Sequence, residues 1–372
     1  MASSATSTTD TTNLYGLVFQ NQAVQSQSQE LRSVAGVSAY IKRNFCSLDY
    51  DGDGHIGRTD VLRMIAKPEM KREDALASAF LYHYRGNLGT TEMSLELNDF
   101  DRLTDPRYRD KAQRTLDQLA KKEDVQANVY PKNRIDPTMI VQGAVADVNF
   151  AAALVALAAT PSGDKRIRKM IESNEDNSYT VTFPGDPNHP IKVKETTLQE
   201  KMVGSCSTDG SQFVTLLEKA YGIHQQIMRI TQQRWGIVRD AFELLTGSQS
   251  QSISLQRNNP LSTEASDMRN RQAILQALKN YKTITLRIGE GECAETSGYV
   301  SHRRVAERQA RGLTLKSAHA YALVDYNEST RMVTICDASK SAIKDRSGFI
   351  QGEINIQLSE LERCFSEINI EV

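Results

Sequence analysis

The chain has 372 residues, enough for two or three domains that each bury a core of their own. Its formal net charge is −1, so no large basic field attracts nucleic acid or an acidic membrane surface. No apolar run approaches the roughly 20 residues of a membrane span, and the start of the chain lacks a signal-peptide pattern. We therefore expect a cytoplasmic protein whose partners include neither nucleic acid nor membrane.

Cysteine usage argues against a disulfide framework or a thiolate zinc site, because the number is odd and no CxxC spacing occurs. The five cysteines are Cys46, Cys206, Cys293, Cys336 and Cys364.

The first 30 residues are rich in Ser, Thr, Gln and Asn and poor in large apolar side chains, which predicts a mobile tail over residues 1–30. Helical periodicity begins at Leu31 and continues to Leu48. A second helix is predicted to start at Val61, so the intervening stretch is a loop between two helices.

This loop, from Asp49 to Asp60, has the EF-hand pattern of calcium-binding loops. Gly54 permits the sharp turn, and Gly57 leaves room for a bridging water. Asp60 stands where a longer Glu is usual, which predicts weaker Ca²⁺ affinity or a better tolerance of Mg²⁺. The predicted metal ligands are the carboxylates of Asp49, Asp51, Asp53 and Asp60 and the backbone carbonyl of His55.

EF-hands pair through a short strand at the eighth loop position, here Ile56. A second loop places Leu95 opposite Ile56, after a helix over residues 72–84 and before one over residues 98–103. Its ligand positions hold unsuitable side chains, with Met93 where Gly is needed. We therefore expect residues 31–125 to form an EF-hand pair with one competent and one degenerate loop.

From residue 126 onward the pattern predicts an α+β domain, with a helical lobe at about 126–222 and a β-rich lobe at about 223–372. The stretch 148–159 is apolar on nearly every side, which is typical of a helix buried in a core. Residues 247–259 read as a polar linker. Further helices are expected at 164–171, 212–221, 241–245, 269–280 and 359–365, and strands at 177–183, 191–193, 283–288, 318–326, 332–336, 354–358 and 368.

Several segments of residues 133–372 occur in the order found in the calpain protease core, a branch of the papain-like cysteine peptidases. Gln142-Gly143 followed by Asp147-Val148 resembles the nucleophile loop Gln-Gly-x-x-Gly-Asp-Cys. The run 216–221 (LLEKAY) resembles a family helix, and 318–321 (AHAY) resembles the Gly-His-Ala-Tyr strand. The segments Phe242–Gly247 and 352–365 are similar to further pieces of that core.

The resemblance implies the role of each site residue. His319 corresponds to the general base, Gln142 to the oxyanion donor, and Asp337 to the residue that orients the histidine, an Asn in the family. Val148 occupies the position of the nucleophilic Cys, and a valine cannot form a thiolate.

Three hypotheses remain open at this point. In the first, the chain is a calcium-binding calpain-like protein that has lost peptidase activity and binds a peptide or protein, with calcium as a regulator. In the second, it is an active calcium-dependent endopeptidase that uses another nucleophile, of which Cys293 is the least constrained by its surroundings. In the third, the protein is structural and the EF-hand is a stabilising clip.

Overall fold

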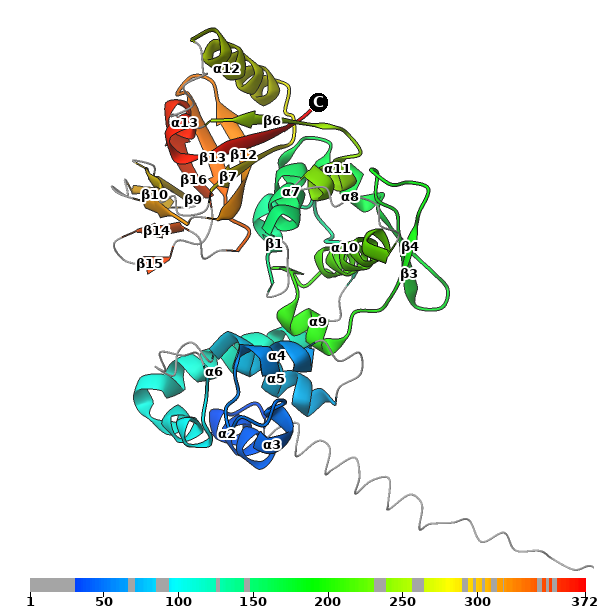
Figure 1. Ribbon diagram of the computed structural model, residues 1–372, viewed down its shortest axis with the longest axis vertical. Coiled ribbons are helices and arrows are strands. Elements are labelled where there is room, and N and C mark those ends of the chain that lie inside the picture. Colours follow the sequence, from blue (N-terminus) through cyan, green and yellow to red (C-terminus); the bar gives the residue numbers. More distant parts are fainter. Residues whose placement is uncertain are drawn as a thin grey trace, which may run out of the picture. The chain divides into compact units, whose positions relative to one another are not determined.

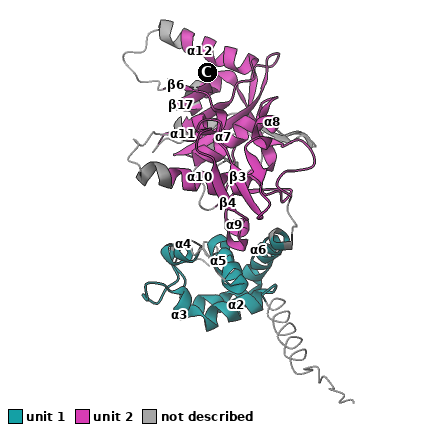
Figure 2. Ribbon diagram, turned by 90° about the vertical axis from the view of Figure 1, so that its right-hand side faces the viewer, with its two compact units in different colours: residues 1–125 teal, residues 126–372 magenta. Residues whose placement is uncertain are grey.

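The computed structural model divides into two compact units, residues 1–125 and 126–372 (Figure 2). The predicted mobile tail, residues 1–30, lies outside the described residues. The structure describes residues 31–65, 71–84, 94–124, 128–143, 148–230, 239–255, 264–289, 294–296, 299–302, 305–308, 313–316, 318–339, 343–345, 348–349 and 353–372.

The first unit is helical, and its buried side chains include Ile41, Ile56, Phe80 and Phe100. The helix predicted from Leu31 to Leu48 is interrupted at Asn44, whose side chain donates a hydrogen bond to the Tyr40 carbonyl. The elements of this unit are α2 (Val34–Arg43), α3 (Phe45–Leu48), α4 (Arg58–Ile65), α5 (Arg72–Tyr84), η2 (Leu97–Thr104) and α6 (Pro106–Asp124).

The second unit begins with a helical part built around α7 (Val148–Ala159). Every residue of α7 from Phe150 to Ala158 is buried, as its uniformly apolar sequence predicts. The other helical segments of this part are η3 (Pro137–Met139), α8 (Gly163–Arg168), α9 (Leu198–Val203), α10 (Phe213–Ile230) and α11 (Arg239–Thr246). Two small sheets complete this part: β1 (Ile140–Val141) with β5 (Cys206–Ser207), and β2 (Ile171–Ser173), β3 (Ser178–Val181) and β4 (Ile191–Lys194).

An eight-stranded sheet dominates the rest of the unit, in the order β10-β9-β16-β13-β12-β7-β17-β6. Its strands are β6 (Ser250–Ser254), β7 (Ile284–Ile288), β9 (Tyr299–His302), β10 (Val305–Arg308), β12 (His319–Asn327), β13 (Met332–Cys336), β16 (Glu353–Gln357) and β17 (Glu367–Glu371). A four-stranded sheet contains β8 (Ala294–Thr296), β11 (Leu313–Leu315), β14 (Ile343–Asp345) and β15 (Gly348–Phe349). The helical segments are α12 (Glu264–Lys279), η4 (Leu358–Glu360) and α13 (Leu361–Cys364).

The two faces of the large sheet contribute to two different cores. Along β12, Ala322 belongs to the core that contains α7, whereas Tyr321 and Leu323 belong to the core that contains α12 and α13. This division follows from the alternation of side chains along a strand. Figure 1 accordingly shows α7 and α13 on opposite sides of the sheet.

The unit is α+β, as the sequence predicts, but two details differ. The lobe boundary expected near residue 222 falls inside α10, and Phe242 and Leu245 still pack into the first core. The expected linker 247–259 contains β6, which pairs with β17 at the sheet edge. Ile253 is the one large apolar residue of β6, so the strand depends on backbone pairing that no local pattern reveals.

No helix in the described residues combines the length and the hydropathy that a membrane crossing would need.

A buried carboxylate at the end of β17 connects the two cores of the second unit. Glu371 accepts hydrogen bonds from Arg166 of α8, at 2.7 Å, and from the Thr283 hydroxyl. Burial alone would raise the pKa of Glu371, but the hydrogen bonds and the charge of Arg166 outweigh it and lower the pKa below its usual value.

A carboxylate with a lowered pKa stabilises the folded state above its unfolded pKa of about 4.3, and this contribution is lost as pH falls through the lower, folded value. We expect Glu371→Gln to lower the free energy of unfolding by about 2 kcal/mol at pH 7, less than for a fully buried pair because Arg166 keeps a quarter of its side chain exposed. The deficit should shrink below about pH 4.

Urea denaturation at both pH values measures this effect. Glu367→Gln, on the same strand but in a weaker contact with Arg287 at 4.0 Å, is the matched control and should change stability little. Equal effects of the two substitutions at pH 7 would contradict the assigned role of Glu371.

Candidate functional site

The structure brings two predicted site residues, His319 and Asp337, into direct contact. His319 begins β12 and Asp337 directly follows β13, and both side chains are buried. The Nε2 atom of His319 lies 2.8 Å from Oδ1 of Asp337. Because a carboxylate only accepts hydrogen bonds, Nε2 carries the proton, and Nδ1 is the nitrogen that can accept one from a substrate or nucleophile.

The Asp337 carboxylate is held by further donors. The backbone N–H and the hydroxyl of Ser339 donate to it at 2.9 and 2.8 Å. The ring of Tyr321 packs edge-on against His319, with 5.0 Å between centroids. Burial, with a smaller effect of the Asp337 charge, raises the pKa of Tyr321. The imidazole is therefore fixed in orientation by a carboxylate and an aromatic ring.

Gln142, the predicted oxyanion donor, lies beside this pair through its backbone. Its N–H donates to the carbonyl of Ala338 at 2.8 Å, one residue after Asp337. The neighbouring Gly143 N–H donates to the hydroxyl of Ser205 at 2.9 Å. His319 and Asp337 are thus in direct contact, and the backbone of Gln142 bonds to the residue that follows Asp337.

Sequence reasoning missed the two residues that support the Gln142 loop. Ser205, buried after α9, and Glu218, on α10, form a bidentate pair in which the Ser205 N–H and hydroxyl donate to the Glu218 carboxylate at 2.7 and 2.8 Å. Burial raises the pKa of Glu218, and the bonds from Ser205 oppose that rise. An acid within the apolar run LLEKAY is the sequence signal that could have identified this support.

Val148 is the first residue of α7 and is half-buried. Asp147 and Ala146, which precede it, lie outside the described residues. Helix α7 packs against β12 and β7, so Val148 is fixed relative to His319 through helix–sheet packing. A valine side chain offers neither a proton nor a lone pair, so no proton exchange between Val148 and His319 is chemically possible.

Ala318, just before His319, has a left-handed backbone with φ of 49°. The resemblance places Gly at this position, and the left-handed region costs a residue with a Cβ about 1 kcal/mol or more. This strained residue directly precedes the predicted base, His319. The N–H of Ala318 donates to the Gly289 carbonyl at 3.0 Å, which helps to hold this conformation.

The cysteines that could replace a nucleophile at position 148 lie in different environments. Cys336 and Cys364 are buried in the first and second cores, and Cys46 is exposed in the first unit. Cys206 is half-buried on β5, where it pairs with Val141, next to Gln142. Cys293 lies outside the described residues.

A second candidate site is the loop between α3 and α4 in the first unit. Ligand oxygens of Asp49, Asp51 and Asp53 lie within 4.8 Å of one another. Backbone N–H groups of the loop donate to these carboxylates, including Gly54 to Asp49 at 2.9 Å. Gly54 has a φ of 86°, which is the conformation that its position in the loop requires.

The last predicted ligand, Asp60, is not part of that cluster. It is buried, and its two oxygens accept from the N–H groups of Tyr50 and Gly57 at 2.9 and 2.8 Å. His55 also lines the loop, where its N–H donates to the Asp53 carboxylate at 2.8 Å. The Asp60 carboxylate therefore closes the loop by accepting hydrogen bonds from the backbone of Tyr50 and Gly57.

The pairing predicted between the two loops is present. Ile56 and Leu95 form an isolated antiparallel bridge with backbone hydrogen bonds of 2.8 and 3.1 Å. The ligand positions predicted to be degenerate, residues 88–93, lie outside the described residues.

Taken together, the second unit is an α+β domain with a buried His–carboxylate pair beside a Gln-Gly loop and a helix N-terminus, as in a cysteine peptidase. A protein-family model described as calpain family cysteine protease matches residues 108–344, more than half of the chain. The chain belongs to the calpain family. The match begins inside α6 and continues through β12 and β13. No curated protein matches the chain.

The close approach of Gly143 to the loop at Gly204 gives a testable requirement of the site. A Cβ at Gly143 would lie 2.1 Å from the Gly204 carbonyl carbon, whereas a Cβ at Gly222, in α10, meets nothing within 4 Å. We expect Gly143→Ala to destabilise the protein by about 2 kcal/mol or more, because backbone must move. Gly222→Ala should instead stabilise the protein by about 0.5–1 kcal/mol through helix propensity.

Thermal unfolding of both variants measures the difference. A Gly143→Ala variant as stable as the unmodified chain would contradict the close packing of this loop.

Proposed function

We propose that this calpain-family protein is a calcium-binding, catalytically inactive peptidase homologue that acts as a calcium-responsive binding or regulatory module. The observation that carries the proposal is Val148 at the first residue of α7, where the resemblance places the nucleophile. Removing a nucleophile from a peptidase costs on the order of 10⁶ in rate. The remaining groups, His319, Asp337 and Gln142, can hold and polarise a bound peptide carbonyl but cannot form an acyl-enzyme.

Binding without cleavage is supported by the state of the remaining groups. The His319–Asp337 pair is hydrogen-bonded, and the Gln142 loop is supported by Ser205 and Glu218. A site whose polar groups are held in place in this way can select a polypeptide through hydrogen bonds to the polypeptide backbone. We infer a protein or peptide partner for this surface.

One observation favours the alternative of an active endopeptidase. Cys206 is half-buried and pairs with Val141, so this thiol lies next to the loop that carries Gln142. A peptidase that used Cys206 would lose its turnover on Cys206→Ala. This variant therefore separates the two functions.

We expect the purified protein to bind fluorescently labelled casein and to leave it intact in Ca²⁺, because no thiolate stands at position 148. Fluorescence anisotropy measures binding, and gel electrophoresis measures cleavage, with an active cysteine peptidase as the assay control. Calcium-dependent cleavage that a thiol-directed inhibitor blocks would overturn the proposal. If Cys206→Ala then abolished that cleavage, the active-peptidase alternative would hold.

Calcium binding is supported by the chemistry of the loop in the first unit. Three carboxylates converge within 4.8 Å, and in the described part of the chain no Lys or Arg forms an ion pair with any of them. Mutual repulsion of three like charges favours a divalent cation with oxygen ligands. When bound, Ca²⁺ or Mg²⁺ would be held by Asp49, Asp51 and Asp53 and would draw the loop together.

We expect Ca²⁺ to stabilise the protein by about 2.7 kcal/mol at a concentration 100 times its Kd. Asp53→Asn should weaken binding about tenfold or more, because one of three ligand charges is lost. Asp101→Asn, which removes an exposed acid paired with Lys42 in the same unit, is the matched control. Calorimetry with Ca²⁺ and with Mg²⁺ provides the measurement.

Absence of binding heat and of a melting shift with either ion would contradict the metal site. Stabilisation by Ca²⁺ with unchanged casein binding would instead support the third hypothesis, in which the loop is a structural clip.

A further inference from the structure

A cavity of about 730 Å³ lies at the end of the large sheet, on the face that α12 and η4 cover. It is formed by α12, by the turn between β12 and β13, and by the segment from the end of β16 to the start of α13. Its volume lies within the range of about 300–1,000 Å³ typical of small-molecule sites.

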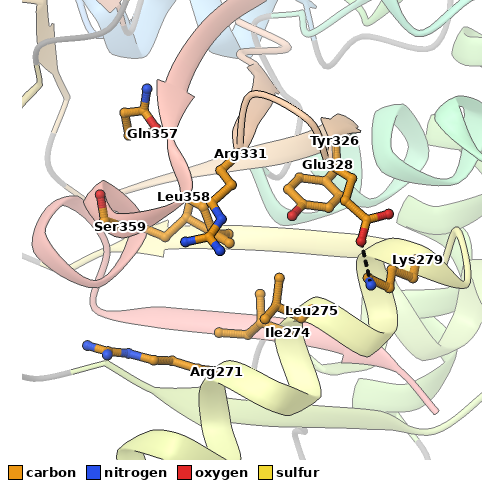
Figure 3. Close-up of a pocket in the computed structure, with 11 residues that line it drawn as sticks. Arg271, Ile274, Leu275, Lys279, Tyr326, Glu328, Arg331, Gln357, Leu358 and Ser359 are labelled. Carbon is orange, nitrogen blue, oxygen red and sulfur yellow. Dashed lines mark ion pairs between the residues drawn. The ribbon is translucent and has the colours of Figure 1, made fainter.

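The interior of the cavity is aliphatic. Ile274 and Leu361 are buried in the adjoining core, and Leu275 and Leu358 are half-buried at the cavity wall. In Figure 3, Ile274 and Leu275 rise from α12 and Leu358 lies across the opening from them. An apolar ligand body would therefore contact side chains from two elements that are distant in sequence.

The charged groups at the rim are mostly basic. Lys279 and Glu328 form an ion pair at 2.6 Å, which neutralises both charges and raises the pKa of Lys279. Arg271 and Arg331 also line the cavity. In the described part of the chain no acidic side chain pairs with Arg331, whose guanidinium extends toward Leu358 and Leu275 in Figure 3.

The geometry points to a binding site for a small amphipathic anion, with a carboxylate or phosphate head at Arg331 and an aliphatic body against Leu275 and Leu358. Arginine favours both head groups because its planar guanidinium forms paired hydrogen bonds with them. Tyr326, with its ring at the same rim, offers a further hydroxyl donor. This site uses none of the residues around His319 or in the Asp49 loop.

The test uses calorimetry on the full chain without Ca²⁺, with octanoate and octyl phosphate below their micellar concentrations and 1-octanol below its solubility limit. We expect one or both anions to bind at least tenfold more tightly than octanol, and the preferred anion identifies the head group. Arg331→Gln should weaken anion binding about tenfold and leave octanol unchanged. Lys282→Gln, which removes an exposed charge outside the cavity, should change nothing.

A second variant, Leu275→Trp, places an indole where the aliphatic body of the ligand would lie and should weaken binding of all three compounds, with circular dichroism as the check on folding. Absence of anion binding, equal binding of octanol and octanoate, or an unchanged affinity in Arg331→Gln would overturn the proposal. These measurements use neither casein nor Ca²⁺, so their outcome is independent of whether the proposed function is correct.

Discussion

The packing of α7 against β12 and β7 is the contact on which the second unit depends. The helix is rich in alanine, so its backbone can approach the sheet closely, and its buried face has no polar side chain to satisfy. This contact joins the helical core to the large sheet. It also fixes the start of α7, at Val148, relative to the start of β12, at His319.

Buried polar groups are the second constraint, and three of them are held by partners from other elements of the fold. Asp337 holds His319, Arg166 and Thr283 hold Glu371, and Glu218 holds Ser205. A buried charge without such a partner would cost several kcal/mol, so these pairs stabilise one arrangement of the chain over others. The His319–Asp337 pair is thus held by the same kind of buried hydrogen bond as the pairs that serve only the fold.

Much of this could be predicted from the sequence where the signal is local. The apolar run of α7, the bridge between Ile56 and Leu95 and the family segments around Gln142 and His319 all depend on residue type at fixed spacing. Strand β6 could not be predicted, because its pairing with β17 joins segments more than 100 residues apart in sequence. The acid in the run LLEKAY marks Glu218 as unusual, but its partner Ser205, and the contact of Ser205 with Gly143, depend on the fold.

We propose that the site has a base, His319, and no nucleophile, because Val148 stands at its position. Peptide-resolved alkylation of a Val148→Cys variant with iodoacetamide across pH, alone and combined with His319→Ala, checks this proposal. If His319 faces position 148, the new thiol should react with a pKa well below the value of about 8.5 for a free cysteine, and His319→Ala should restore that value. An ordinary thiol pKa that does not respond to His319→Ala would contradict the account.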